Sequence, residues 1–177
     1  MVRVLIETEI GEIEAEIEIE RAPVTAGNFL RYVDAGFYDG GIWHRTVLPD
    51  NQPDNEIRIE VIQGGVNPAR EDQRFGPIPL ERTTVTGLSH RDGTISMSRF
   101  APDSAVSDIF ICIGDQPSLD FGGLRNPDGQ GFAAFGQVTS GMDVVRAIQH
   151  SAHEEQRLTP PVGIIRVTRD EEVGHEG

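Results

Sequence analysis

A strict alternation between glutamate and apolar residues at positions 12–20 constrains the fold of this chain more than any other feature. The segment reads Glu-Ile-Glu-Ala-Glu-Ile-Glu-Ile-Glu, a period of two over nine positions. Successive side chains of a β-strand point to opposite faces, so the pattern predicts a strand with one buried and one solvated face. With the preceding segment and a turn at Gly11, it predicts a β-hairpin over residues 2–20. We interpret the acidic face as solvated surface; a patch for a basic partner is the alternative.

The rest of the chain repeats short strand patterns between turns. Glycine and proline, 20 and 11 of 177 residues, make up about one residue in six. Apolar stripes at helical spacing predict only two helices, over 22–37 and 141–150. Further strands are predicted over 42–47, 56–63, 93–98, 108–114, 131–139 and 162–168.

These elements are too poor in helix for a parallel βαβ fold. They predict a mainly β protein, a closed eight-stranded antiparallel barrel with two capping helices. Residues 1–169 are expected to form this single domain, and residues 170–177 a frayed acidic tail.

The charge balance excludes several classes of partner. All 15 basic residues are arginine, against 29 acidic residues, and the formal net charge is −14. Binders of nucleic acid or of anionic membranes need a basic face, so neither partner is expected. The longest uncharged run, residues 129–142, is shorter than the roughly 20 residues of a membrane-spanning helix.

The lone cysteine and the chain start bear on the compartment. Cys112 lies in an apolar run and is interpreted as a buried, inert thiol without a disulfide partner. The first residues show no signal-peptide pattern, so a cytoplasmic location is expected. A periplasmic or exported protein whose signal had been removed would look the same.

The residues that usually mark catalytic centres are scattered. The five histidines never show the H-E-x-x-H spacing, and no G-x-S-x-G motif is present. His150 and His153 are interpreted as a polar helix end, with a metal site as the alternative. We therefore expect neither a metal nor another cofactor.

Instead, a series of short motifs lies at strand edges in a fixed order. It comprises Trp43-His44-Arg45, Ile62-Gln63-Gly64-Gly65, Ser96-Met97, Asp108-Ile109-Phe110-Ile111 and Phe135-Gly136. In this order they resemble the cyclophilins, barrel-shaped peptidyl-prolyl cis–trans isomerases, over residues 2–168. The resemblance is to bacterial-like members with a divergent substrate groove.

The resemblance implies a role for each matching position. Arg45 matches the family's catalytic arginine and Gln63 its glutamine that orients the substrate backbone. Further substrate-binding positions fall on Val61, Phe110, Leu119, Phe132, Ser98, Arg99 and Asp108. Of the two charged groove residues, we expect Arg99 to be the freer one, because it begins a loop while Asp108 begins a strand.

Some positions depart from the family pattern. The family's groove tryptophan falls on Ser118, and Phe121 or Leu124 of a longer loop is a candidate to replace its packing. The pocket phenylalanine falls on Glu60. These changes leave the match at Arg45 and Gln63 intact and affect the groove.

Taken with the resemblance, the sequence predicts a cofactor-free peptidyl-prolyl isomerase. Its partners would be proline-containing peptides or unfolded proteins, and the protein would act as a monomer. A catalytically weak proline-peptide binding or chaperone module with the same fold is the alternative.

Overall fold

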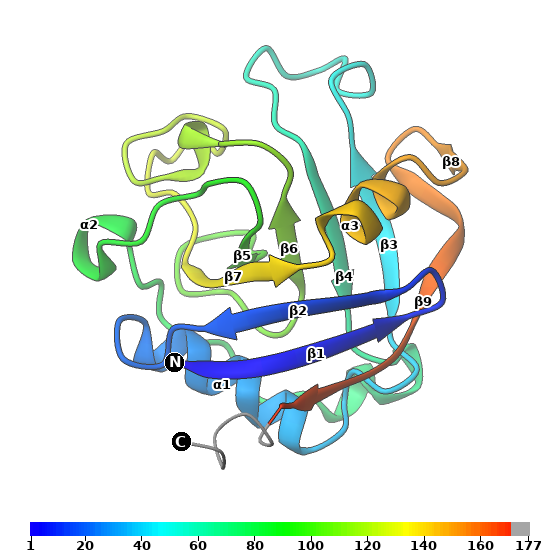
Figure 1. Ribbon diagram of the computed structural model, residues 1–177. Coiled ribbons are helices and arrows are strands. Elements are labelled where there is room, and N and C mark those ends of the chain that lie inside the picture. The colour runs from blue at the N-terminus through cyan, green and yellow to red at the C-terminus, as the bar shows by residue number, and fades with distance from the viewer. Residues whose placement is uncertain (171–177) are drawn as a thin grey trace.

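The computed structural model describes residues 1–170, and its strands form a closed antiparallel barrel (Figure 1). Eight strands close the barrel in the order β1-β2-β7-β5-β6-β4-β3-β9, because β9 also pairs with β1. The ninth, β8, adds a short hairpin to the edge of β9. The bounds are β1 Val2–Thr8, β2 Glu12–Ile17, β3 Ile42–Val47, β4 Val61–Gly65, β5 Thr94–Met97, β6 Ile109–Cys112, β7 Ala134–Ser140, β8 His153–Glu154 and β9 Arg157–Arg169. The predicted eight-stranded barrel is confirmed.

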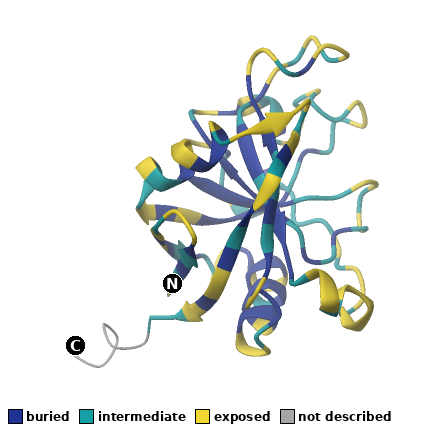
Figure 2. Ribbon diagram, turned by 90° about the vertical axis from the view of Figure 1, so that its right-hand side faces the viewer, coloured by how far each residue is buried: buried dark blue, intermediate teal, exposed yellow. Residues whose placement is uncertain are grey.

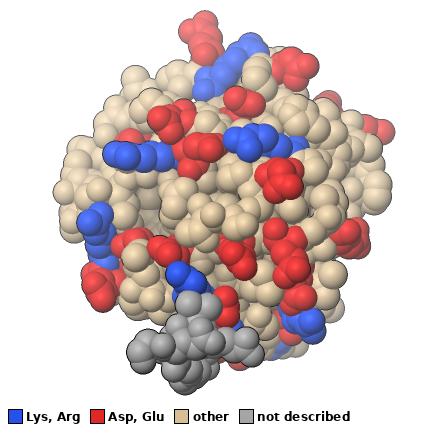
Figure 3. All heavy atoms as spheres, in the orientation of Figure 1, with Lys and Arg blue, Asp and Glu red and all other residues tan. Residues whose placement is uncertain are grey.

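The first hairpin follows the alternation of its sequence. Ile13, Ala15 and Ile17 are buried in the barrel, and the glutamates between them point outward. The strand ends at Ile17, three residues before the end of the alternation. Figure 3 shows acidic side chains spread over the face that carries β1 and β2, with arginines between them.

Two helices cover the ends of the barrel, as predicted. α1 (Pro23–Asp34) crosses the lower end in Figure 1 and α3 (Met142–Gln149) the upper end. Their apolar stripes join the core that fills the barrel, seen as dark blue in Figure 2. The remaining helices are short turns in loops: η1 (Pro68–Gln73), α2 (Thr83–Thr86) and η2 (Pro117–Leu119).

The predicted strand 56–63 is shifted toward its glycines. Residues before Val61 lie in a loop, because the Gln52 side chain bonds both backbone groups of Ile59 in place of a neighbouring strand. Gly64 and Gly65 continue β4 instead of ending it. A Cβ on Gly64 would lie 2.5 Å from the Trp43 ring, and one on Gly65 would lie 2.2 Å from the Asp108 carboxylate. Both glycines are thus required for close packing.

The last strand begins earlier than the predicted 162–168. β9 starts at Arg157 and forms a hairpin with β8, with Glu155 in the left-handed region at φ 56°. The pairing with β3 shifts register between Val162 and Arg157, so Pro160 and Pro161 lie where the ladder does not use their missing N–H groups.

Among the described residues, no helix is long and apolar enough to cross a bilayer. The predicted tail lies outside the described residues, except for Asp170, whose backbone N–H donates to Arg3.

Candidate active site

Arg45, Gln63 and Phe110 form a row across three adjacent strands. Arg45 of β3 is the register partner of Gln63 of β4, which is in turn the partner of Phe110 of β6. Register partners share one face of a sheet. The residues next to them on the strands, such as Ile62 and Ile111, fill the barrel interior, so this row lies on the outer face.

A β-bulge aims Arg45 outward. Simple alternation along β3 would place Arg45 on the same side as Trp43, which is fully buried in the core. The register with β4 shifts between these two residues, so that His44 is the extra residue of the β3 strand. Such a bulge re-aims the side chain that follows it. The arginine consequently joins Gln63 outside the barrel.

The Arg45 guanidinium is held by two amide oxygens. Its Nη1 donates to Gln63 Oε1 at 2.9 Å, and its Nε donates to Gln156 Oε1 at 2.9 Å. Burial lowers the pKa of Arg45 from its ordinary value, but a guanidinium titrates so high that it stays charged. Among the described residues, nothing is hydrogen-bonded to Nη2. The site thus holds an oriented cation with donors left for a ligand.

The other end of the Gln63 amide is also bonded. Its Nε2 donates to Ser98 Oγ at 3.1 Å and to Asp108 Oδ2 at 3.2 Å. The same carboxylate oxygen lies 3.1 Å from Nε2 of His44. Since the two acceptors take the Nε2 donors, the amide oxygen of Gln63 must face Arg45.

Apolar side chains form a second cluster outside the barrel, beside the polar row. Phe110 and Phe132 pack at right angles, with ring centroids 5.6 Å apart. The buried members of this cluster are Val47, Ile59, Val61, Phe110, Cys112 and Leu119, and Phe132 is partly exposed against them. The cluster therefore offers an apolar, partly exposed edge within a few residues of a charged donor.

A buried histidine that the sequence analysis did not single out supports Phe110. The His90 ring stacks on Phe110, with centroids 6.0 Å apart and planes 13° apart. His90 Nδ1 lies 2.7 Å from Asp120 Oδ1, and His90 Nε2 lies 2.8 Å from Ser96 Oγ. Burial raises the pKa of Asp120, but the hydrogen bonds from His90 outweigh it and leave that pKa below its usual value. A lone histidine in a loop carried no sequence signal for this role.

The sequence analysis predicts that Arg99 has fewer partners within the protein than Asp108, the other charged residue of the groove. This prediction is wrong. The Arg99 side chain is 1% exposed and pairs with both carboxylate oxygens of Asp128, at 2.9 and 3.0 Å. It also donates to Gly131 O and lies over the Phe132 ring, 4.7 Å from its centroid. The Arg99 bond lowers the pKa of Asp128. Arg99 thus holds a loop in place, whereas the Asp108 side chain is 32% exposed.

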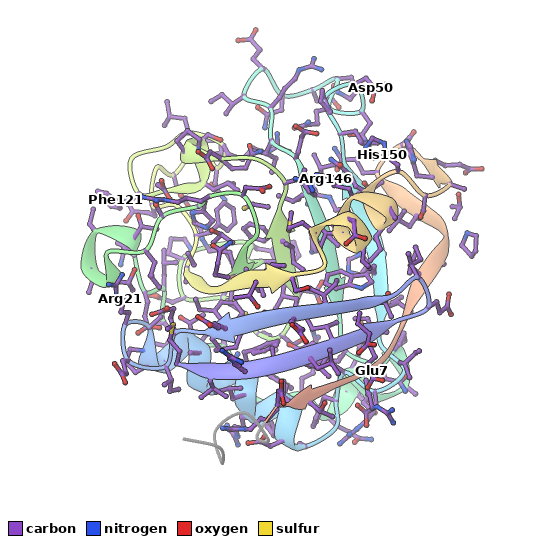
Figure 4. The ribbon with its side chains drawn as sticks, in the orientation of Figure 1. Glu7, Arg21, Asp50, Phe121, Arg146 and His150 are labelled. Atoms are coloured by element: carbon purple, nitrogen blue, oxygen red, sulfur yellow. The ribbon has the colours of Figure 1, made fainter. Side chains whose placement is uncertain are left out.

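Neither Phe121 nor Leu124 replaces the missing tryptophan packing. Both are exposed, at 43% and 57%, and neither belongs to the apolar cluster; Figure 4 labels Phe121 at the edge of the molecule. The loop instead contributes Arg125, which donates to Gln52 and to the carbonyl of Ile57.

Glu60 does not line the apolar cluster either. Its carboxylate accepts from Gln149 of α3 at 3.1 Å. The position that matches the family's pocket phenylalanine is thus occupied by a residue that links the loop before β4 to α3.

A cavity of about 590 Å³ opens on the other side of Arg45. Its lining residues come from β3, the β8–β9 hairpin and the start of β9, and most are polar or charged: His44, Arg45, Glu154, Glu155, Gln156, Arg157 and Pro161. No cluster of three or more metal-ligating side chains is found within residues 1–170.

Ser96, His90 and Asp120 are hydrogen-bonded in series, but Ser96 and His90 are 0% and 2% exposed, so this serine is not accessible to a substrate. The accessible part of the site combines a fixed cation, an oriented amide and an apolar edge. Such a set can bind and polarise an amide without breaking a covalent bond.

Comparisons with known proteins agree on one family. The family model described as "Cyclophilin type peptidyl-prolyl cis-trans isomerase/CLD" matches residues 3–169. Peptidyl-prolyl cis-trans isomerase A of Dickeya dadantii is 37% identical over 146 residues, which cover 82% of this chain and 70% of the relative. Peptidyl-prolyl cis-trans isomerase B of Escherichia coli is 34% identical over 143 residues, 80% of each chain.

The fold comparison points the same way. A Cryptosporidium parvum cyclophilin type peptidyl-prolyl cis-trans isomerase, crystallised in the presence of the dipeptide Ala-Pro, superimposes with a TM-score of 0.74. The match covers 94% of this chain and 98% of that one, at 20% sequence identity.

Proposed function

This chain belongs to the cyclophilin-type peptidyl-prolyl cis-trans isomerase family, and we propose that its reaction takes place over Arg45, Gln63 and Phe110. The protein is a peptidyl-prolyl cis-trans isomerase whose substrates are proline-containing peptides and proteins. The observation that carries the site is the row of register partners joining the charged donor to the apolar cluster.

Isomerisation needs an oriented donor and no covalent catalyst. Resonance holds the X-Pro amide planar with a barrier of about 18–20 kcal/mol. In the twisted transition state the prolyl nitrogen regains its lone pair and becomes a hydrogen-bond acceptor. A donor that bonds this nitrogen lowers the barrier, and a 10⁵-fold acceleration corresponds to about 6.8 kcal/mol. A preorganised charged donor can lower the barrier by several kcal/mol.

Arg45 is proposed as this donor. Its Nε and one Nη1 hydrogen are bonded within the protein, so Nη2 remains for the substrate. A guanidinium keeps its charge at any working pH and presents its donors in a rigid plane. Gln63 is proposed to orient both the arginine and the substrate backbone.

The substrate proline is proposed to lie against the apolar cluster. Phe110, Val61, Leu119 and Phe132 would contact its ring, and their burial limits access of water. Ser98 and Asp108, which bond Gln63, would border the backbone next to the proline. Arg99 would act on the groove through its contact with Phe132.

Residues 1–169 are assigned to the catalytic domain. We propose that it acts as a monomer, since a net charge of −14 opposes self-association. A cytoplasmic location is proposed, and the single buried, unpaired cysteine is compatible with its reducing conditions.

A protease-coupled assay tests the function. A protease that cleaves only the trans form of a short Ala-Pro peptide reports the rate of isomerisation. The chain is expected to remove the slow phase at substoichiometric concentration. A slow phase that persists at equimolar protein would contradict catalysis, and binding of the peptide without acceleration would indicate a proline-peptide binding module.

A further inference from the structure

Gln156 contacts the catalytic arginine from an element that the proposed mechanism does not use. It lies in the turn between β8 and β9, 111 residues from Arg45, and its Oε1 accepts from Arg45 Nε at 2.9 Å. Gln63 accepts from Nη1 on another edge of the same guanidinium. The cation thus lies between two neutral amide oxygens from β4 and from this turn.

The orientation of the Gln156 amide is set by its surroundings. Its Nε2 donates to the carbonyl of Asn51 at 3.1 Å, so its oxygen must point toward Arg45. Its backbone oxygen accepts from the N–H of Thr46, the residue after Arg45, at 2.8 Å. These two contacts fix the glutamine at both ends.

Asn51 is held just as firmly. Its Nδ2 donates to the carbonyls of Thr46 and Glu155, both at 3.0 Å, and its Oδ1 accepts from Leu48 N at 2.7 Å. Figure 4 labels the neighbouring Asp50 on this loop. Through Asn51, the loop after β3 therefore holds the β8–β9 turn in place.

The chemistry of the two amides suits a donor that must stay a cation. A carboxylate in either place would neutralise the guanidinium and compete with the substrate for its hydrogens. Neutral amide oxygens orient the plane and leave the charge available. They use Nε–H and one hydrogen of Nη1, and both hydrogens of Nη2 remain.

We propose that Gln156 is a positioning residue for catalysis, which holds the Arg45 guanidinium plane so that Nη2 meets the prolyl nitrogen. The inference rests on the proposed role of Arg45. Because Gln156 contacts the arginine and not the substrate, its loss should lower kcat with little effect on KM.

The test compares Gln156→Met with Gln137→Met. Methionine matches glutamine in length but lacks the amide. Gln137 lies on β7, which does not adjoin β3, and it also bonds backbone groups, so it controls for a lost glutamine hydrogen bond. Gln156→Met is expected to lower kcat about tenfold, with KM within about twofold of the wild type. Gln137→Met is expected to keep the wild-type kcat.

A nuclear magnetic resonance measurement tests the contact without an activity assay. The Arg45 Nε–H signal, assigned by its loss in Arg45→Ala, should exchange with solvent more slowly in the wild type than that of Arg21, whose side chain is 62% exposed. In Gln156→Met this protection should disappear while the melting temperature stays near that of the wild type. Fast exchange of the wild-type Arg45 signal would overturn the proposal even if the variant did not fold.

The outcomes separate this inference from the proposed function. Inactive wild-type protein, or a fully active Arg45→Ala variant, would contradict the proposed function. An active wild type with an inactive Arg45→Ala variant and a fully active Gln156→Met variant would overturn the role of Gln156 alone. Equal proportional effects of Gln156→Met in the wild-type and Arg45→Ala backgrounds would also overturn it, since a positioning residue acts through the arginine.

Discussion

The charge of one side chain dominates the proposed chemistry at the residue scale. Arg45 donates to two glutamines, and no described residue is hydrogen-bonded to its Nη2, which is proposed to bind the substrate. Arg45→Ala is expected to lower kcat/KM by about 10²–10³-fold, the usual effect of removing a preorganised donor. The protease-coupled assay measures this, and a thermal melt checks that the variant is folded.

The control for this prediction is a second arginine. Arg21→Ala removes an exposed side chain whose only ion pair within residues 1–170, with Glu18, spans 4.0 Å, and it should leave activity unchanged. Unchanged turnover of Arg45→Ala with an intact melting transition would contradict the assignment. Loss of folding in that variant would instead indicate a structural role for the arginine.

Cys112 gives a second prediction at this scale. The side chain is fully buried in the apolar cluster, and burial raises the pKa of its thiol far above the ordinary value. A thiol that stays protonated is a poor nucleophile. The native protein at pH 8 is expected to resist a thiol-specific reagent such as dithionitrobenzoate.

Denaturation provides the reference for this measurement. In guanidinium chloride the same reagent should titrate one thiol per chain, since Cys112 is the single cysteine. Complete modification of the native protein within seconds would mean that the cluster around Cys112 opens readily.

At the scale of elements, the loops decide the shape of the site. The segment between β6 and β7 is tied to the loop before β5 by Asp120 and His90, and to the loop between β5 and β6 by Asp128 and Arg99. His90 in turn supports the ring of Phe110. The apolar side of the site thus depends on polar bonds made by its loops.

Asp120→Asn tests this dependence through pH. The folded protein holds the pKa of Asp120 below its usual value, so the ionised carboxylate stabilises the fold. That contribution is fully present above the unfolded pKa and is lost as the pH falls through the lower folded pKa. The variant is expected to lose about 1 kcal/mol of unfolding free energy at pH 7. The difference from wild type should shrink as the pH falls below about 4.

Denaturant unfolding at several pH values measures this effect. Asp54→Asn, at an exposed position on another loop, is the matched control and should show no such difference at any pH. A difference between Asp120→Asn and wild type that is constant from pH 7 to pH 3 would show that the Asp120 charge does not stabilise the fold.

The molecule as a whole carries a strong negative field. Its formal charge is −14, and Glu154 and Glu155 line the cavity beside Arg45. Because Arg99 is paired with Asp128, it is not available to form an ion pair with an acidic side chain of a substrate and so to oppose this field. Peptides with Lys next to the proline are therefore expected to have a kcat/KM several-fold above those with Glu.

Salt distinguishes this field from a direct contact. Screening lengths fall from about 30 Å at 0.01 M to about 3 Å at 1 M, so the preference for Lys should fade as salt is added. A peptide with uncharged Gln next to the proline serves as the reference for the Lys and the Glu peptide. A preference for Glu at low salt would contradict the dominance of the acidic surface and restore a role for Arg99.

Local patterns determined much of this molecule before any contact was known. The alternation in residues 12–20, two helical stripes and the spacing of short apolar runs predict the barrel and its caps. Each of these patterns can be seen in a short stretch of sequence, because a strand or helix buries one face and its apolar residues therefore recur at the period of that element. The short motifs around Arg45, Gln63 and Phe110 also lie in the predicted order on neighbouring strands.

The tertiary structure alone decided how the side chains of the site are paired. Simple alternation would place Arg45 beside Trp43, and only the bulge at His44 turns it outward. The pairing of Arg99 with Asp128 and the contact of Gln156 with Arg45 join residues 29 and 111 positions apart. A hydrogen bond between distant residues depends on where loops place their ends, and no local periodicity in the chain encodes that distance.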